Sequence, residues 1–319
     1  MRRPWPEGSD VTTPRKGQTH APEPIAPGIF RLRAPNPSPM TEAGTNTYLL
    51  GAREIAVIDP GPEDPAHLDA ILRALPRGAR ITHVIVTHSH LDHSPLARPL
   101  AEATGAPVLG FGPSTAGRSA VMEALAAAGH EMGGGEGVDA AFAPDHVLAD
   151  GEVIGGDGWR LEVVHTPGHF GNHICLGEPR LGVLFTGDHV MGWAPSLVSP
   201  PDGDMGDFMR SLDRLGRRRA DTLYLPGHGA PVTRPHERVE ELRRHRLARE
   251  AAIRAALAEG PGTPAALAAR IYTDVPAALL PAAARNVFAH LVELARKNEA
   301  KADGPLSPAA TFHLAGPRG

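Results

Sequence analysis

Histidine and aspartate side chains gather in four short motifs that spread over about half of the chain. Thr87–His93 reads T-H-S-H-L-D-H, and three glycine-flanked turns read T-P-G-H, T-G-D-H and P-G-H-G. The residues of interest in these motifs are His88, His90, Asp92, His93, His169, Asp188 and His228. Neutral imidazole nitrogens and carboxylate oxygens suit divalent zinc, manganese or iron. Two such ions side by side can present a bridging hydroxide to an ester or phosphodiester, so the pattern predicts a dinuclear metal-dependent hydrolase.

The spacing of these residues divides them between two metal ions. His88 and His90 lie two apart after an apolar strand, where alternate side chains point the same way, so they can bind one ion. Asp92 and His93 lie where the chain turns into a helix, and they can address a second ion. The remaining three residues complete the set: His169 on the first ion, His228 on the second, and Asp188 between them. We expect two divalent ions, with zinc as the first choice and manganese or iron as alternatives.

Three residues are expected to act in catalysis. Binding to a metal ion lowers the pKa of water to about 7, which supplies hydroxide near neutral pH. Asp188 would hold the ions together and orient this nucleophile, and Asp92 would act with it. His173, four residues beyond His169, is the candidate for a group that contacts the substrate oxyanion. The alternative for His173 is a buried structural histidine.

Short apolar runs alternate with helical patterns between residue 25 and the last of these motifs, which predicts an α/β fold. The expected strands are 46–50, 54–58, 82–87, 107–111, 160–166, 173–176, 182–186 and 222–225. The expected helices are 65–75, 95–104 with Ser94 as N-cap, 120–128, 235–257, 263–271 and 279–296.

The composition describes an ordinary globular protein. The formal net charge is −4 and 41% of the residues are hydrophobic, which argues against a polybasic nucleic-acid binder, and no DNA is expected as a partner. No apolar run reaches the roughly 20 residues that a membrane span needs. The single cysteine, Cys175, excludes an internal disulfide and fits a reducing cytoplasm. The sequence leaves monomer and homodimer open.

Composition also divides the chain into segments. Residues 1–24 are rich in proline and charge and are expected to form a disordered leader. Residues 25–234 would form the catalytic domain, in which 112–158 is either an insertion that shapes the substrate entrance or a surface excursion. Residues 235–302 would form a small helical domain, with a turn or wing at 297–303, and residues 303–319 a frayed tail.

One stretch of the helix expected at 235–257 is strongly basic. His245 lies among Arg243, Arg244, Arg246 and Arg249. We interpret this stretch as a solvated face that pairs with neighbouring glutamates, in preference to an RNA-binding surface.

The four metal motifs, in this order, resemble those of the metallo-β-lactamase-fold hydrolases. The resemblance implies a four-layer αβ/βα sandwich with the metal site at one edge between two sheets. It implies His88, His90 and His169 on one ion, Asp92, His93 and His228 on the other, and Asp188 as the bridge. Asp59, in V-I-D-P-G, matches an acidic residue that orients a histidine ligand in this family.

Within this family the sequence looks closest to the β-lactamase-like protein 2 group. The resemblance rests on the motifs G-T-N-T-Y-L-L at 44–50 and G-D-H-V-M-G-W at 187–193 and on the C-terminal helices. The group implies a winged-helix-like C-terminal domain and includes an endoribonuclease that acts on single-stranded RNA. The expected function is hydrolysis of an ester, a thioester or a phosphodiester. An endoribonuclease that acts on single-stranded RNA is the first alternative, and a mononuclear-iron sulfur dioxygenase is the second.

Overall fold

The computed structural model describes residues 21–129, 137–273 and 276–316. Residues 1–20, most of the expected disordered leader, lie outside the described residues. The end of that leader was assigned wrongly, because strand β1 (Glu23–Ala26) pairs antiparallel with β2 (Ile29–Arg33). The folded part therefore begins before residue 25.

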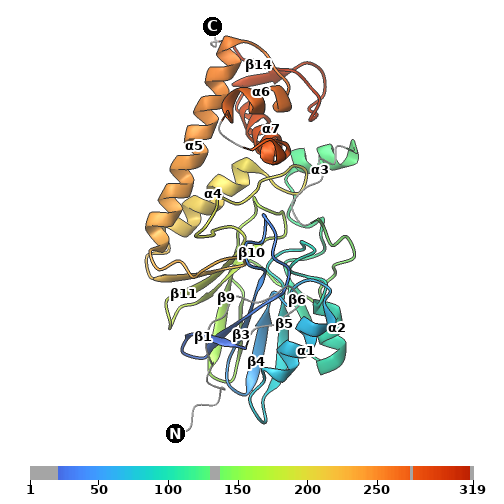
Figure 1. The fold of residues 1–319 in the computed structure, drawn as a ribbon, viewed down its shortest axis with the longest axis vertical. Coiled ribbons are helices and arrows are strands. Elements are labelled where there is room, and N and C mark those ends of the chain that lie inside the picture. Colours follow the sequence, from blue (N-terminus) through green and yellow to red (C-terminus); the bar gives the residue numbers. More distant parts are fainter. Residues whose placement is uncertain (1–20, 130–136, 274–275, 317–319) are drawn as a thin grey trace.

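Two β-sheets stack in the lower part of the molecule as Figure 1 shows it, below the C-terminal helices. The larger sheet has the order β1-β2-β3-β4-β5-β6-β7, and the smaller has the order β12-β11-β10-β9-β8. The larger sheet continues with β3 (Asn46–Leu50), β4 (Glu54–Ile58), β5 (Arg80–Ile85), β6 (Val108–Gly110) and β7 (His146–Val147). The smaller contains β8 (Val153–Gly156), β9 (Trp159–His165), β10 (Ile174–Glu178), β11 (Val183–Gly187) and β12 (Leu223–Pro226). Strands β4 to β7 are parallel to one another, as are β11 and β12, so both sheets are mixed.

Helices cover the outer faces of both sheets and complete four layers. Ile85 and Leu176 belong to the apolar core between the sheets. Helices α1 (Pro65–Arg73) and α2 (Ala97–Thr104) pack Ile71 and other side chains on the outer face of the larger sheet. Helix α4 (Met205–Gly216) packs Phe208 on the smaller sheet. The predicted αβ/βα sandwich is confirmed.

Helix α2 begins later than the sequence suggested. Its first residue is Ala97 and Leu96 is the N-cap, so the prediction of Ser94 as N-cap is wrong. The Ser94 hydroxyl instead lies 2.7 Å from Asp139 Oδ2 and 3.2 Å from the His90 carbonyl oxygen. Ser94 therefore fixes the loop that carries the histidines rather than the helix terminus.

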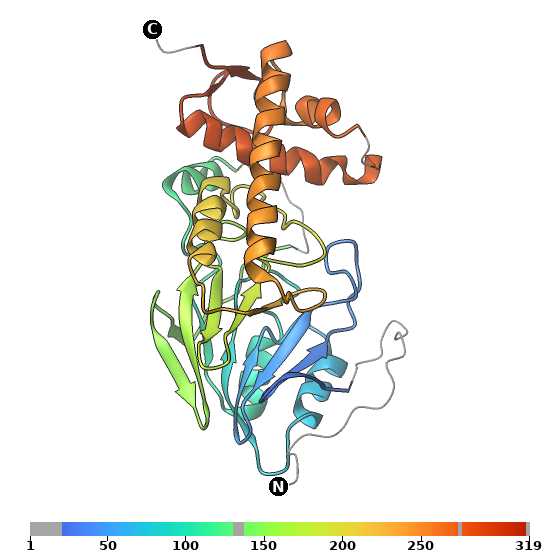
Figure 2. The ribbon, with the colours of Figure 1, turned by 90° about the vertical axis from the view of Figure 1, so that its left-hand side faces the viewer.

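The C-terminal region forms a small domain of helices and one hairpin. It contains α5 (Pro235–Glu259), α6 (Pro264–Ile271), the 3-10 turn η1 (Ala277–Leu279), α7 (Leu280–Arg296), β13 (Ala300–Ala302) and β14 (Phe312–Leu314). Helix α5 belongs to two cores, since Leu242 packs with α4 whereas Leu257 packs with α7. Figure 2 shows α5 as one long helix that runs from the sandwich to this domain. In the described part of the chain, no helix is long and apolar enough to cross a membrane.

The chain after residue 303 is not simply a frayed tail, which corrects the sequence-based prediction. Strand β14 pairs antiparallel with β13, and Phe312 is fully buried with its ring centroid 6.3 Å from that of Phe288. The hairpin is the wing of the domain. Strand β14 was difficult to predict from the sequence because it has only three residues within a Pro- and Gly-rich segment.

The segment 112–158 also joins the folded structure. Its helix α3 (Ala120–Ala127) inserts Met122 and Leu125 into the core of the C-terminal domain. Helix α3 therefore links this part of the segment to the C-terminal domain.

Candidate metal centre

The seven predicted ligands meet at one edge of the sandwich. Each lies just beyond a strand end: Thr87–His93 after β5, His169 after β9, Asp188 after β11 and His228 after β12. Backbone hydrogen bonds join the two sheets at this edge, from Ile174 N to Thr87 O at 2.9 Å and from Asn46 N to Gly227 O at 2.7 Å. The ligands therefore come from two sheets but share one rigid frame.

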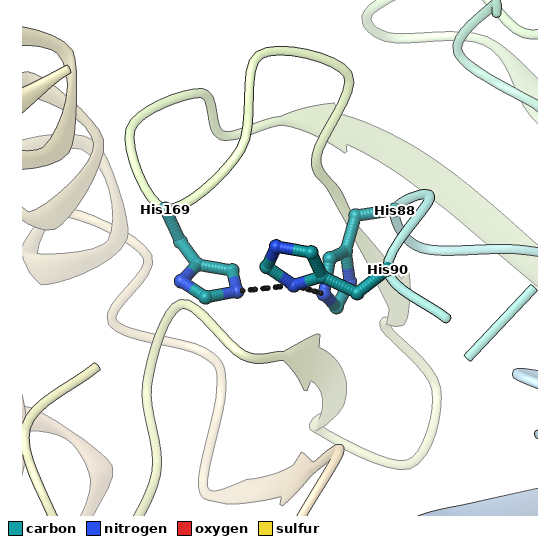
Figure 3. Close-up of side chains that lie close together, drawn as sticks. All are labelled: His88, His90 and His169. Atoms are coloured by element: carbon teal, nitrogen blue, oxygen red, sulfur yellow. Dashed lines mark hydrogen bonds between the residues drawn. The ribbon is translucent and has the colours of Figure 1, made fainter. Parts of the chain in front are cut away.

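Three histidines form the first group. His88 Nε2 lies 3.0 Å and His169 Nε2 lies 3.1 Å from Nδ1 of His90. Figure 3 shows the three rings converging, with these two contacts dashed. Three ring nitrogens this close together can supply three ligands to one tetrahedral or octahedral ion.

One aspartate and two histidines form the second group. Asp92 Oδ2 lies 3.0 Å from His228 Nε2 and 3.3 Å from His93 Nε2, and these two nitrogens are 3.3 Å apart. All three side chains are buried. The group has the mixed oxygen and nitrogen donors that a hard or borderline divalent ion prefers.

Asp188 lies between the two groups. Its Oδ2 is 3.7 Å from His169 Nε2 of the first group and 3.3 Å from His228 Nε2 of the second. Its Oδ1 is buried, lies 3.5 Å from His93 Nε2, and accepts no hydrogen bond that meets the usual geometry among the described residues. An unsatisfied buried carboxylate oxygen is costly, and a cation would satisfy it. The residues present therefore fit a pair of divalent ions.

Hydrogen bonds fix the tautomers of the histidines. His169 Nδ1 donates to the Leu197 carbonyl at 2.7 Å, and His228 Nδ1 donates to the Gly44 carbonyl at 3.4 Å. His93 Nδ1 lies 3.0 Å from Asp59 Oδ2. In each case Nδ1 carries a proton, so Nε2 is the nitrogen that faces the centre and would bind a metal after loss of any proton on it.

Asp59 orients the candidate ligands that follow strand β5 of the larger sheet. Besides His93, its carboxylate accepts hydrogen bonds from Thr87 N at 2.7 Å and Thr87 Oγ1 at 2.8 Å. The Thr87 hydroxyl can then accept from His88 Nδ1, 3.0 Å away. Asp59 has a φ of 51°, which is rare for a residue other than glycine and marks local strain that the fold must hold. The expected role in orienting a histidine is confirmed by this geometry.

Burial and charge set the protonation of the ligands. Burial and the neighbouring His169 lower the pKa of His90 to about 3, which keeps its ring neutral. Burial opposes protonation of His228 too, but the carboxylates of Asp188 and Asp92 outweigh it and raise the pKa of His228 to about 10. The same carboxylates raise the pKa of His93 against the effect of burial. Protons therefore balance the two aspartates where cations would otherwise lie, and metal binding would displace them.

The turn that carries His228 has no room for a side chain at Gly227. A Cβ there would lie 2.3 Å from Asp188 Oδ1 and 2.6 Å from His93 Cε1. The buried Asn46 amide holds the turn by donating to the carbonyls of Pro226 at 3.0 Å and Gly229 at 2.9 Å. Sequence analysis missed Asn46, although a polar amide within the apolar run N-T-Y-L-L was the available signal.

The structure does not support the catalytic role predicted for His173. Its side chain is fully buried, and its Nε2 accepts a hydrogen bond from Asp188 N at 3.2 Å. Nδ1 then donates to Thr166 Oγ1 at 2.8 Å. Burial lowers the pKa of His173 well below its usual value, so the ring stays neutral in this arrangement. His173 positions the Asp188 backbone and is the structural histidine that was the alternative interpretation.

A cavity of about 840 Å³ opens onto the centre. Ligand residues that line it are His90, Asp92, His169, Asp188 and His228. The C-terminal domain contributes Tyr272, Leu279, Ala282, Ala283 and Asn286. The expected insertion contributes Ser114, Thr115, Arg118, Ala126, Gly137, Val138 and Ala140. Both segments therefore shape the space in front of the ligands.

Arg246 also lines this cavity and is only 3% exposed, so the interpretation of its helix stretch as a solvated face is wrong at this residue. Arg244, two residues earlier, is exposed as expected. The sequence alone could not distinguish the buried Arg246 from the exposed Arg244, because burial of Arg246 depends on the packing of α5 against α4 and α7.

The chain belongs to the metallo-β-lactamase superfamily, a superfamily of hydrolases. Residues 40–228 match that superfamily and residues 263–305 match the β-lactamase-associated winged helix domain. The predicted family, fold and enzyme class are thereby confirmed.

Individual proteins also match most of the chain. A β-lactamase-like protein 2 homolog of Drosophila melanogaster is 30% identical over 291 residues, covering 86% of this chain and 90% of that protein. An atrochrysone carboxyl ACP thioesterase of Aspergillus chevalieri is 29% identical, and the match covers 74% of this chain and 67% of that protein. The crystal structure of a metallo-β-lactamase family protein from Thermus thermophilus superposes with a TM-score of 0.72 at 28% identity, covering 91% of this chain and 99% of that one.

Proposed function

We propose that the chain is a dinuclear hydrolase that cleaves a carboxylic ester or thioester with a substantial apolar part. The convergence of six side chains around Asp188 carries this proposal. His88, His90 and His169 would hold one ion, and Asp92, His93 and His228 the other. Asp188 faces both groups at distances of 3.3 to 3.7 Å. Zinc is the metal we expect, with manganese or iron as alternatives.

When bound, such a pair of ions supplies a nucleophilic water and polarises the oxygen of the scissile group. The residues of the chain do the positioning. Asp59 and Thr87 hold the rings of His88 and His93, and the Leu197 carbonyl holds His169. His173 holds the Asp188 backbone, so that the buried carboxylate keeps its place between the two groups.

The cavity wall supports an acyl substrate. Its apolar members include Met40, Met191, Leu197 and Leu279. Burial of such surface against an acyl chain is favourable by about 25 cal/mol per Å². A thioesterase among the relatives agrees with this chemistry.

Single-stranded RNA is less well matched to the cavity. RNA-binding grooves combine a track of cations with aromatic rings on which bases stack. Of the two arginines in the cavity wall, Arg118 is ion-paired with Asp202 at 2.6 Å and Arg246 is a single buried cation, so they form no exposed track. No lysine is among the described residues that line the cavity. The aromatic members of the wall are Trp193 and Tyr272, from different parts of the chain.

A hydrolysis panel on the purified full chain tests the proposal. The panel contains a long-chain and a short-chain acyl thioester, an acyl ester, nitrocefin, bis-p-nitrophenyl phosphate and single-stranded RNA. We expect turnover of the acyl substrates with a preference for the long chain, and loss of that turnover in Asp188→Asn. Faster turnover of RNA than of any acyl substrate, or oxygen uptake with one iron per chain, would overturn it.

A further inference from the structure

Arg246 is a buried cation in the wall of the catalytic cavity. It lies on α5, where this helix passes from the sandwich to the C-terminal domain, and 3% of its surface is exposed. Its guanidinium carbon stacks 4.9 Å above the centre of the Phe208 ring. The same cavity is lined by the metal-ligand candidates His169 and Asp188. A group bound at Arg246 therefore shares one space with the centre.

The protein leaves much of the Arg246 guanidinium unsatisfied. Nη1 donates to Asn286 Oδ1 at 3.2 Å and Nη2 donates to the Ser196 carbonyl. A guanidinium carries five N–H groups, so three remain after these two. One of them is on Nε, which is buried without a hydrogen-bond partner among the described residues. The flat face is covered by Phe208, and the free donors lie along the edge.

No negative charge compensates this cation within the described part of the chain. Both acceptors, the Ser196 carbonyl and the Asn286 amide, are neutral, and none of the ion pairs between described residues includes Arg246. Burial lowers the pKa of Arg246 to about 10, which leaves it charged at neutral pH. A buried charge is costly unless it is paired, so the arrangement is incomplete without an anion.

The surroundings add positive rather than negative charge. Arg249 lies one turn of α5 away, and its guanidinium is 4.6 Å from the ring centre of Tyr272 in the cavity wall. Burial together with Arg246 and Arg249 lowers the pKa of His245, another wall residue, to about 4. The potential at this part of the cavity therefore favours an anionic group.

We propose that Arg246, supported by Asn286, binds an anionic group of the substrate, a carboxylate or a phosphate ester, while the scissile acyl group lies at the metal centre. The planar edge of a guanidinium matches the two oxygens of such a group. The inference rests on the proposed function for the position of the scissile bond. It adds a substrate class: acyl compounds with an apolar spacer and a second, charged end.

A purely structural role for Arg246 is the competing explanation. Through Ser196 the guanidinium holds the loop whose Leu197 carbonyl orients His169. Asn286 Oδ1 binds the same loop by accepting from Val198 N at 3.2 Å. Removal of Arg246 could thus weaken the metal centre for every ligand. The test must separate loss of an anion from general damage.

Calorimetric binding of octanoate, octyl phosphate and octanamide to the metal-loaded full chain makes this separation. We expect at least one of the two anions to bind about tenfold or more tightly than the neutral amide, the range for a charge-assisted hydrogen bond. The anion that binds more tightly distinguishes a carboxylate site from a phosphate site. Arg246→Gln should remove the preference and leave octanamide binding within about twofold. Arg244→Gln, on the exposed face of the same helix, is the matched control and should bind all three ligands with the affinities of the parent chain.

Asn286→Asp is the decisive second variant. It keeps the Oδ1 acceptor for Arg246 and Val198 but supplies the missing negative charge from within the protein. We expect the preference for an anion to fall by about tenfold while the fold and octanamide binding remain. If Asn286→Asp and Arg246→Gln both retain the preference for an anion, the metal ions hold that anion and the proposal is wrong. Equal affinities of all three ligands for the parent chain would also overturn it.

Turnover distinguishes failure of this proposal from failure of the proposed function. Monothioesters of suberic acid, with the far end either a free carboxylate or a methyl ester, share one scissile bond. We expect Arg246→Gln to raise KM for the free acid by about tenfold, with little change in kcat. Anion binding without turnover of either thioester would overturn the proposed function alone. Equal turnover of the two thioesters, unaffected by Arg246→Gln, would overturn the anion site alone.

Discussion

The cavity has two sides that are built by different interactions. The metal-ligand side consists of His90, Asp92, His169, Asp188 and His228. The helical side consists of His245, Arg246, Tyr272, Leu279 and Asn286. The carbonyl groups of Leu197 and Gly44 fix His169 and His228 on the first side, whereas the second side combines one unpaired cation with polar and apolar side chains. The first side is suited to bond cleavage and the second to substrate selection, and the Ser196–Leu197 loop connects Arg246 with His169 between them.

The largest expected effect lies on the metal-ligand side. Asp188→Ala should abolish hydrolysis, with a loss in kcat/KM of about 10³-fold or more, because its carboxylate serves both groups. The chain should remain folded, since β11 and β12 pair through backbone hydrogen bonds. Steady-state kinetics and circular dichroism measure the two properties. Unchanged turnover would rule out the two-metal centre.

Damage to the C-terminal core should affect stability and spare the metal centre. Phe312→Ala removes a fully buried ring and should reduce the free energy of unfolding of the C-terminal domain by about 3–5 kcal/mol. Denaturant unfolding measures this loss, and metal content should stay at the parental value. Leu314→Ala, at an exposed position of the same strand, is the control and should cost far less. Loss of metal together with stability in Phe312→Ala would show that the two sides are not independent.

Asp59→Asn tests the support of the ligands rather than a ligand itself. The variant weakens the acceptor for His93 and Thr87 and should lower metal affinity by about 10–100-fold. Competition with a calibrated chelator measures the affinity. Asp69→Asn, an exposed carboxylate on α1, should leave it unchanged. Parental affinity in Asp59→Asn would mean that strain at Asp59 serves another purpose.

The smallest effect is expected at the cavity mouth. Trp193 is 39% exposed and lines the cavity. Trp193→Ala should raise KM for a long-chain acyl thioester by about threefold with kcat unchanged, because it removes apolar contact that ground state and transition state share. The short-chain thioester provides the internal control. A fall in kcat for both chains would instead tie Trp193 to the metal-ligand side.

The two sides also differ in how far sequence alone could predict them. The convergence of the seven candidate ligands could be predicted because each lies in a short motif at a strand end, and the strands bring these ends to one edge of the sandwich. His173 was assigned wrongly, because spacing from His169 does not show that its ring turns inward to Asp188 N. Arg246 was missed because its burial depends on contacts between helices that are distant in the sequence. Helix α4 escaped prediction despite its aspartate N-cap at Asp204 and the buried Phe208, Leu212 and Leu215.

The most direct test of the account is the metal stoichiometry of the purified full chain, measured by elemental mass spectrometry beside Asp188→Asn. Two groups of three candidate ligands on either side of Asp188 predict two divalent ions per chain, and fewer than two in the variant. One ion per chain in the parent, or two ions that Asp188→Asn retains at full affinity, would contradict the dinuclear centre.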